Sequence, residues 1–241
     1  MARKLAAVSG VLTQRARRET ETRLAEQPRR LAHVRGVAAT AERLSRRFDP
    51  QTADCLVAAA WLHDIGYASS LRRTGFHPLD GAEYVRAAGF GELAASLVAF
   101  HTGAHAEAAE RGLSGLSAFS DPPSDFLDVL TFCDLTTGPD GAPISPRDRL
   151  RDVLSRYGSE DPVHRAVDAG RDELLAAVRR VRDVVDLGRV ADELHRMTEE
   201  HGVVGQDTLE PVDGLPRRLL GVVGAVDADG LDGEGQRLLL A

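Results

Sequence analysis

The chain has 241 residues, of which 43% are hydrophobic and 28% are charged, a balance typical of globular proteins and not of disordered ones. Its formal net charge of −7 argues against general nucleic-acid binding. No apolar stretch approaches the ~20 residues that span a bilayer, and no apolar signal core follows the basic N-terminus. We therefore expect a cytoplasmic protein that does not bind membranes.

Hydrophobic periodicity predicts helices along nearly the whole chain, and therefore an all-α fold. After an N-terminal helical arm, we expect helices at about residues 29–48, 52–64, 77–88, 92–102, 125–136 and 145–157. The helix at 52–64 is apolar on most sides and should be central, with Gly66 ending it. The Ala-, Gly-, Ser- and Pro-rich stretch 104–125 should form a loop or lid with little regular structure.

The C-terminal third should begin with a long amphipathic helix at about residues 161–186, followed by a shorter one at about 189–200. Beyond Gly202 the pattern fades, and we assign no structure there. These boundaries divide the chain into an arm (1–28), a main helical domain (29–158), C-terminal helices (159–201) and a glycine-rich tail (202–241).

Two adjacent ionisable residues, His63 and Asp64, end the most apolar helix. Such groups are costly to bury unless they are paired or hold a metal. A histidine nitrogen and a carboxylate oxygen are ligands that Zn, Fe, Mn and Mg accept. By itself a His-Asp dipeptide is more often a capping or surface pair, so the interpretation depends on other candidate ligands.

Further candidates lie on apolar helix faces. Asp134 follows Leu127 and Leu130 at helical spacing, so its carboxylate needs a cation, either a metal or an arginine. His33 and His101 also follow apolar spacing, with a satisfied core histidine as the alternative. His77 precedes a proline at a helix start, where capping is the competing role. Polar surroundings favour a surface position for the other histidines, with His105, four residues after His101, as the only reserve ligand.

The succession His33, His63-Asp64, His77, His101 and Asp134 resembles the HD-domain superfamily of metal-dependent phosphohydrolases. The surrounding segments that carry the resemblance are Leu31-Ala-His-Val-Arg35, Trp61-Leu-His-Asp-Ile-Gly66 and His77-Pro-Leu-Asp-Gly-Ala82. It implies an HD-domain helical bundle with a helical C-terminal extension. It also implies that His33, His63, Asp64 and Asp134 hold one metal, that His77 and His101 complete a second site, and that Asp64 bridges the two.

The implied cofactor is one or two divalent ions, of Fe, Mn, Co, Zn or Mg. Such ions lower the pKa of bound water from ~15.7 towards ~7–9. We expect the resulting hydroxide, with Asp64 and His63 as catalytic residues, to hydrolyse a phosphoester or phosphoanhydride bond of a nucleotide or dinucleotide. Arg72, Arg73 and Arg147 flank the ligand segments and are candidate phosphate contacts, with solvated surface arginines as the alternative.

The sequence departs from the subgroup that cleaves cyclic dinucleotides, because His101 is followed by Thr102-Gly103 and Tyr67 stands where a lysine is usual. Small HD hydrolases of nucleotides or dinucleoside polyphosphates are the closer match. Two alternatives stay open: an HD-type di-iron oxygenase with the same six ligands, and a non-catalytic nucleotide- or metal-binding regulatory module. The long C-terminal helix and the tail are candidate surfaces for a homodimer or another partner.

Overall fold

The computed structural model describes the backbone of residues 10–201 and the side chains of residues 10–188. The chain divides into two compact units, residues 1–182 and 183–241. The helices are α1 (Val11–Arg23), α2 (Pro28–Ser45), α3 (Pro50–Leu62), α4 (His77–Ala87), α5 (Glu92–Phe100), α6 (Ala104–Glu110), α7 (Ser124–Leu135), α8 (Pro146–Leu154) and α9 (Pro162–His201), with short 3₁₀ turns η1 (Ile65–Tyr67), η2 (His101–Gly103) and η3 (Gly115–Ala118).

The described residues contain no strand, which confirms the predicted all-α fold class. Helix starts follow local chemistry. Asp49 accepts hydrogen bonds from the backbone N–H groups of Gln51 and Thr52 at the start of α3 (3.1 and 3.0 Å), and Ser145 accepts one from Asp148 N–H in α8 (3.1 Å). None of the described helices is long and apolar enough to cross a membrane.

Helix α3 is the centre of the first unit, as its apolar composition predicts. Its residues from Leu56 to Leu62 are all buried. It packs against α1, α2, α5 and α7. The start of α1 is capped from α3, because the carboxylate of Asp54 accepts hydrogen bonds from Leu12 N–H (3.1 Å) and Thr13 N–H (2.8 Å). The predicted N-terminal helix therefore folds onto the central helix over its described part.

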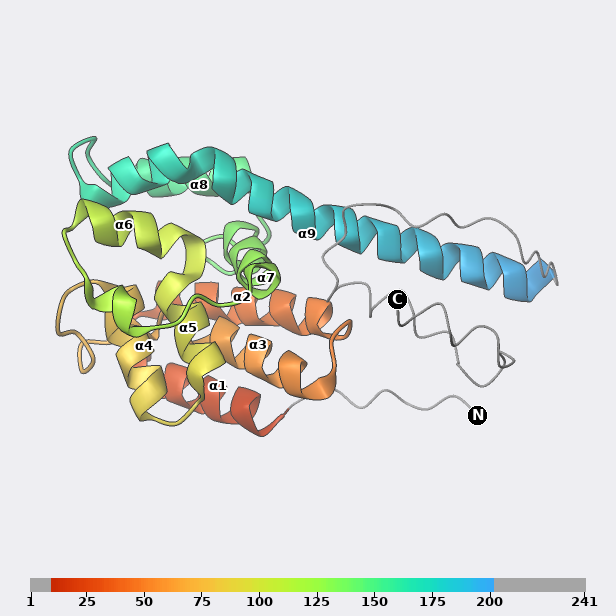
Figure 1. Ribbon diagram of the computed structural model, residues 1–241, viewed down its shortest axis with the longest axis horizontal. Coiled ribbons are helices and arrows are strands. Elements are labelled where there is room, and N and C mark those ends of the chain that lie inside the picture. Colours follow the sequence, from red (N-terminus) through yellow and green to blue (C-terminus); the bar gives the residue numbers. More distant parts are fainter. Residues whose placement is uncertain (1–9, 202–241) are drawn as a thin grey trace, which may run out of the picture. The chain divides into compact units, whose positions relative to one another are not determined.

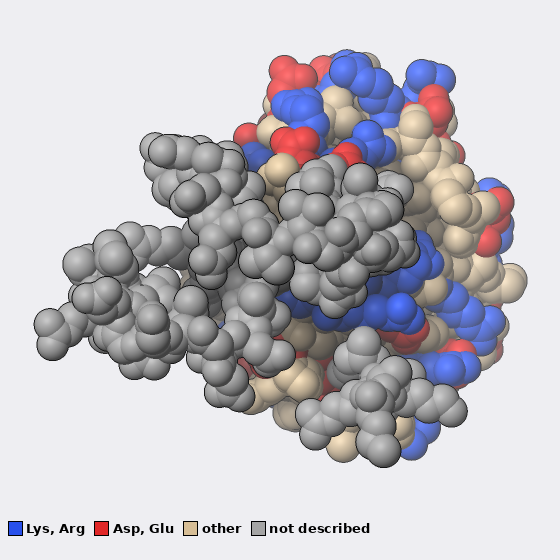
Figure 2. All heavy atoms as spheres, turned by 90° about the vertical axis from the view of Figure 1, so that its right-hand side faces the viewer, with Lys and Arg blue, Asp and Glu red and all other residues tan. Residues whose placement is uncertain are grey.

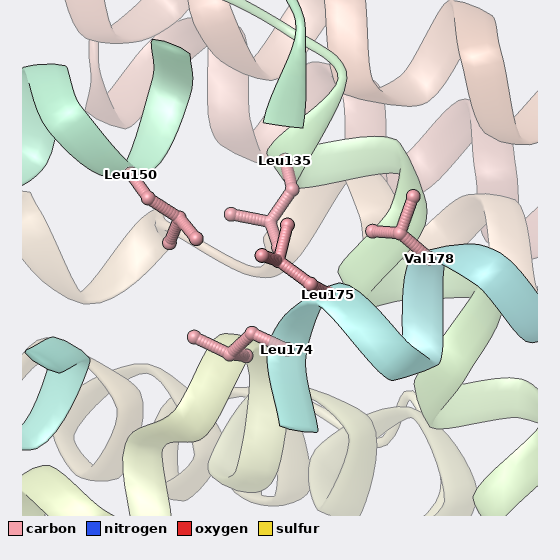
Figure 3. Packing of buried hydrophobic residues seen from close by; sticks show 5 residues of the cluster. All are labelled: Leu135, Leu150, Leu174, Leu175 and Val178. Carbon is pink, nitrogen blue, oxygen red and sulfur yellow. The ribbon is translucent and has the colours of Figure 1, made fainter. Parts of the chain in front are cut away.

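The first half of α9 packs across α7 and α8. In Figure 1 it runs beside α8, above α6 and α7. Leu135 of α7, Leu150 of α8 and three residues of α9 (Leu174, Leu175 and Val178) form one buried cluster (Figure 3). Arg165 of α9 pairs with Glu110 of α6 (2.7 Å). Residues of α8 and of the first half of α9 line one pocket together with Asp64, which follows α3.

Three local predictions were wrong. Residues 104–125 contain helix α6 and the turn η3, because good helix formers in residues 104–110 outweigh the glycines and prolines that follow. Helix α9 continues through Gly188, so the two predicted C-terminal helices are one. Helix α3 ends at Leu62, before Gly66, which lies in η1 without a positive φ. The predicted tail, 202–241, lies outside the described residues.

The described surface mixes both signs of charge. On the face in Figure 2, basic and acidic side chains lie next to one another. Many described arginines pair with carboxylates, as Arg86 does with Glu92 (2.8 Å) and Arg180 with Asp128 (2.6 Å). Exposed pairs of this kind each contribute only about 0.2–1 kcal/mol to stability.

Gly66 allows η1 to touch the start of α4. A Cβ at this position would lie 2.1 Å from the carbonyl oxygen of His77 and 2.7 Å from the backbone nitrogen of Gly81. Only hydrogen fits there, so Gly66 sets the spacing between Asp64 on one side of the contact and His77 on the other.

We expect Gly66→Ala to lower the free energy of unfolding by about 1–3 kcal/mol or more, because two backbone segments must move apart. Gly170→Ala is the matched control: its Cβ would meet open space within α9, so it should be neutral or stabilising by about 0.4–1 kcal/mol. Urea denaturation of both variants tests this. Equal stability of Gly66→Ala and the unsubstituted protein would contradict the close-approach argument.

Candidate metal centre

His63 and Asp64 lie at the buried C-terminal end of α3. His63 follows the last helical residue, and its ring Nδ1 is 2.8 Å from the carbonyl oxygen of Ala60. The exposed fraction is 0% for His63 and 3% for Asp64. The helix end thus projects two ionisable side chains into the interior, where they need partners.

A first group of potential ligands forms around one oxygen of Asp64. Its Oδ2 lies 3.5 Å from Nε2 of His63 and 4.0 Å from Nε2 of His33, which comes from the second turn of α2. Nε2 of His33 is also 3.1 Å from Oδ1 of Asp134, in the last turn of α7. Candidate ligand atoms of His33, His63 and Asp64 all lie within 4.8 Å of one another, a spacing that could hold a metal ion.

A second group forms around the other oxygen of Asp64. Its Oδ1 lies 3.3 Å from Nε2 of His77 and 3.9 Å from Nε2 of His101. The two histidine nitrogens are 3.2 Å apart. Ligand atoms of these three residues also lie within 4.8 Å of one another. Asp64 is therefore shared by both groups, one oxygen to each.

Outer hydrogen bonds orient three of the histidines. Nδ1 of His33 is 3.0 Å from the carbonyl oxygen of Gly138, and Nδ1 of His101 is 2.7 Å from that of Val98. His63 has the corresponding bond to Ala60. A carbonyl oxygen only accepts, so each Nδ1 carries the proton and donates it. Each Nε2 then turns a lone pair toward Asp64, the tautomer that metal-binding histidines adopt.

The donor set fits a divalent metal. The buried Nε2 of His63 has no hydrogen-bond partner among the described residues. His101 Nε2, an acceptor in the tautomer set by Val98, lies close to another imidazole nitrogen. A cation between these nitrogens and the carboxylate would satisfy all of them, and Zn, Mn, Fe and Co accept this combination of imidazole and carboxylate.

Burial controls the protonation of the histidines. It lowers the pKa of His63, His77 and His101 below the ordinary value of 6.5, although the nearby Asp64 carboxylate acts in the opposite direction. The neutral rings are the form that binds metal.

Positive charge controls the protonation of the carboxylates. Burial raises the pKa of Asp64, but the adjacent guanidinium of Arg30 opposes this effect, and the pKa lies well below its ordinary value. For Asp134, the guanidinium of Arg149 likewise opposes burial, and the pKa lies well below its ordinary value. Both carboxylates are therefore ionised at neutral pH and available as ligands.

Two arginines that contact these carboxylates were missed by the sequence analysis. Arg30 Nη1 is 2.6 Å from Asp64 Oδ2, and Arg149 Nη2 is 3.3 Å from Asp134 Oδ1. Arg30 precedes His33 by three residues, so helical spacing places it on the same face of α2, a signal that could have identified it.

Thr102 and Tyr67 complete the surroundings. Thr102, at a left-handed φ of 45°, donates a hydrogen bond from Oγ1 to Asp134 Oδ2 (2.6 Å). The ring of Tyr67 stacks on His77 (centroids 4.0 Å apart), and the guanidinium carbon of Arg30 lies 3.8 Å from the Tyr67 ring centroid. Tyr67 therefore contacts both Arg30 and His77, two side chains that lie against Asp64.

The three predicted phosphate-contacting arginines lie elsewhere. Arg72 and Arg73 are exposed, and Arg73 pairs with Glu83 (3.2 Å). Arg147 lines a separate surface pocket with Arg151. Within the described residues the structure brings together all six predicted ligands but none of these arginines, whose contact with phosphate stays a prediction.

A pocket of about 100 Å³ opens onto the cluster. Asp64, His77, His101 and Asp134 lie on its polar side. Arg30, Arg149, Arg156, Thr102 and Glu107 also line it. The remaining lining side chains are aliphatic or aromatic, among them Tyr67, Leu135, Leu150, Val153, Tyr157, Val163, Val167 and Leu174. Residues from α8 and α9 therefore cover the candidate metal centre and limit its contact with water.

The sequence model of the HD domain matches residues 30–158, more than half of the chain. The chain belongs to the HD-domain family. HD domains bind divalent metals and form a superfamily of metal-dependent phosphohydrolases, which agrees with the clustered ligands. No curated protein and no solved structure matches the chain.

Because Asp64 is shared by both groups of ligands, its substitution should change the metal content of the protein more than substitution of a ligand in one group. Asp64→Ala should lose metal from both groups, whereas His77→Ala should lose it from one. Elemental analysis after equilibration with Mn²⁺ or Fe²⁺ measures both, with His105→Ala, an exposed histidine, as the control. Full metal content in Asp64→Ala would contradict the shared-ligand arrangement.

The lowered histidine pKa values predict the pH dependence of the metal-free protein. Below about pH 6.5 the unfolded chain takes up protons on His63, His77 and His101, while the folded protein does not until a lower pH. The free energy of unfolding should therefore fall as the pH drops below 6.5. Urea titrations in chelator from pH 8 to pH 5 test this, and His101→Gln should flatten the slope. A pH-independent stability over this range would contradict the burial argument.

Proposed function

We propose that the protein hydrolyses a phosphoester or phosphoanhydride bond of a nucleotide or dinucleotide. The observation that carries this proposal is the buried Asp64, whose two oxygens face two separate groups of histidines within the HD domain. A pair of ligand groups that share one carboxylate suits a two-metal centre for phosphoryl chemistry.

A divalent ion, when bound, supplies a Lewis acid for phosphoryl oxygens and lowers the pKa of water. The chain's own residues supply the remaining requirements. His33, His63 and His101 present unprotonated Nε2 atoms, and Asp64 joins this group to that of His77. The ionised carboxylates stay available as ligands because arginines neutralise them in the interior.

Arginines on the pocket wall favour a phosphorylated substrate. Arg30, Arg149 and Arg156 line the pocket together with Asp64 and Asp134. A guanidinium group matches two phosphate oxygens at once and cannot lose its charge at physiological pH. Charge that develops on a phosphoryl group during hydrolysis would therefore meet fixed positive groups in a site that excludes bulk water.

The apolar side of the pocket favours a substrate with an organic moiety. The rings of Tyr67 and Tyr157 lie in the wall with Leu150 and Val153. Planar aromatic groups pack well against such side chains. A nucleoside phosphate combines the required anion with a planar base, which is why we place nucleotides ahead of simple phosphate esters.

Phosphate release from nucleotides and dinucleoside polyphosphates, with added Mn²⁺, Fe²⁺ or Co²⁺, tests the proposal. Removal of an outer-sphere partner of a metal ligand lowers activity by about 10–100-fold. Asp64→Ala removes a ligand itself, so we expect its activity to fall by more than that. Asp168→Ala, a surface residue of α9 paired with Arg171, is the matched control and should retain activity.

Circular dichroism shows whether Asp64→Ala still folds. Near-normal turnover by that variant would contradict the proposal. A metal-loaded protein that releases no phosphate but consumes oxygen when substrate is added would also contradict the proposal, and would support the oxygenase alternative.

A further inference from the structure

A second pocket lies beside the candidate metal centre and is lined mainly by arginine. Its volume is about 250 Å³, and its lining residues are Arg29, Arg30, His33, Pro139, Arg149 and Arg156. No carboxylate is among these lining residues. We call it the arginine pocket. Its composition differs from that of the pocket over the cluster, whose lining also includes carboxylates and many apolar side chains.

The arginine pocket adjoins the candidate active site. Arg30, Arg149 and Arg156 line both pockets, so they form the boundary between them. His33, whose Nε2 is 3.1 Å from Asp134, lies on the arginine-pocket side. A ligand group in the arginine pocket would therefore sit next to a phosphoryl group at the metal ligands.

Arg149 is a buried cation with donor capacity to spare. Its side chain is 8% exposed, and it contacts Asp134 (3.3 Å) and Asp152 (3.2 Å) through its two terminal nitrogens. Its Nε is buried and has no hydrogen-bond partner among the described residues. An unpaired buried donor is costly, so this guanidinium is poorly satisfied by the protein alone.

The other three arginines add further positive charge. Arg29 is exposed and pairs with no described residue. Arg156 bonds Asp152, the carboxylate that also holds Arg149, so one side chain orients both guanidinium groups. The four arginines of the pocket form ion pairs with only three described carboxylates, Asp64, Asp134 and Asp152. A net positive charge remains before any metal ion is added.

From this geometry we propose that the arginine pocket binds a second phosphoryl group of the substrate, beside the one that is hydrolysed. The inference rests on the proposed function and narrows its substrate class to compounds with two or more phosphoryl groups, such as nucleoside di- and triphosphates or dinucleoside polyphosphates. Arginine forks suit this role because each pairs bidentately with phosphate oxygens.

Substrate preference tests the subsite. The ratio of kcat/KM for a nucleoside triphosphate to that for the matching monophosphate should be high, and should fall about tenfold or more in the Arg29→Ala/Arg156→Ala double variant, because charge-assisted hydrogen bonds to the extra phosphates are lost. Arg151→Ala, an exposed arginine of α8, is the control and should leave the ratio unchanged. An unchanged ratio in the double variant, or equal losses on both substrates, would overturn the subsite.

Direct binding separates the subsite from the proposed function. Calorimetry of the full-length, metal-free protein with inorganic pyrophosphate should show binding that weakens about tenfold or more in the double variant and not in Arg151→Ala. Binding with this pattern but no phosphate release by the metal-loaded protein would retain the subsite and reject the hydrolase. If the metal-loaded protein releases phosphate but the double variant binds pyrophosphate as tightly as the unsubstituted protein, the hydrolase is retained and the subsite is rejected.

Discussion

The structure depends on one buried carboxylate. Asp64 is 3% exposed, and each of its oxygens faces a different group of imidazole nitrogens. An ionised carboxylate in the interior is strongly unfavourable unless cations compensate for the lost hydration. Arg30 supplies part of that compensation, at 2.6 Å from Asp64. Metal ions bound between Asp64 and the surrounding histidine nitrogens would supply the remaining positive charge. The packing of the helices brings these partners together around this one side chain.

The partners come from several helices, with Arg30 and His33 both from α2, and backbone contacts set their positions. Gly66 lets η1 touch the start of α4, which brings His77 to Asp64. The carbonyl of Gly138, in the turn after α7, fixes the ring of His33 in α2. Leucines and valines of α7, α8 and α9 then cover the centre with an apolar layer. The same layer carries Arg149, so the element that excludes water also brings positive charge to the site.

Much of this could be predicted from the sequence, for identifiable reasons. The ligands were recognisable because ionisable residues on apolar helix faces need partners, and their order matches that of HD domains. Arg149 could not be predicted, because its contact with Asp134 crosses a turn between two helices. Residues 104–110 were misjudged because composition over a long window concealed a short helical segment. The continuity of α9 was missed because one glycine costs a helix only about 1 kcal/mol, too little to break it.

The central claim is that Asp64 joins two metal sites. Anomalous diffraction from crystals of the Mn²⁺- or Fe²⁺-loaded protein, collected at the absorption edge of the metal, tests it most directly. The account predicts two peaks, one among Asp64, His33 and His63 and the other among Asp64, His77 and His101. Metal bound away from Asp64, or a protein that takes up none under these conditions, would contradict it.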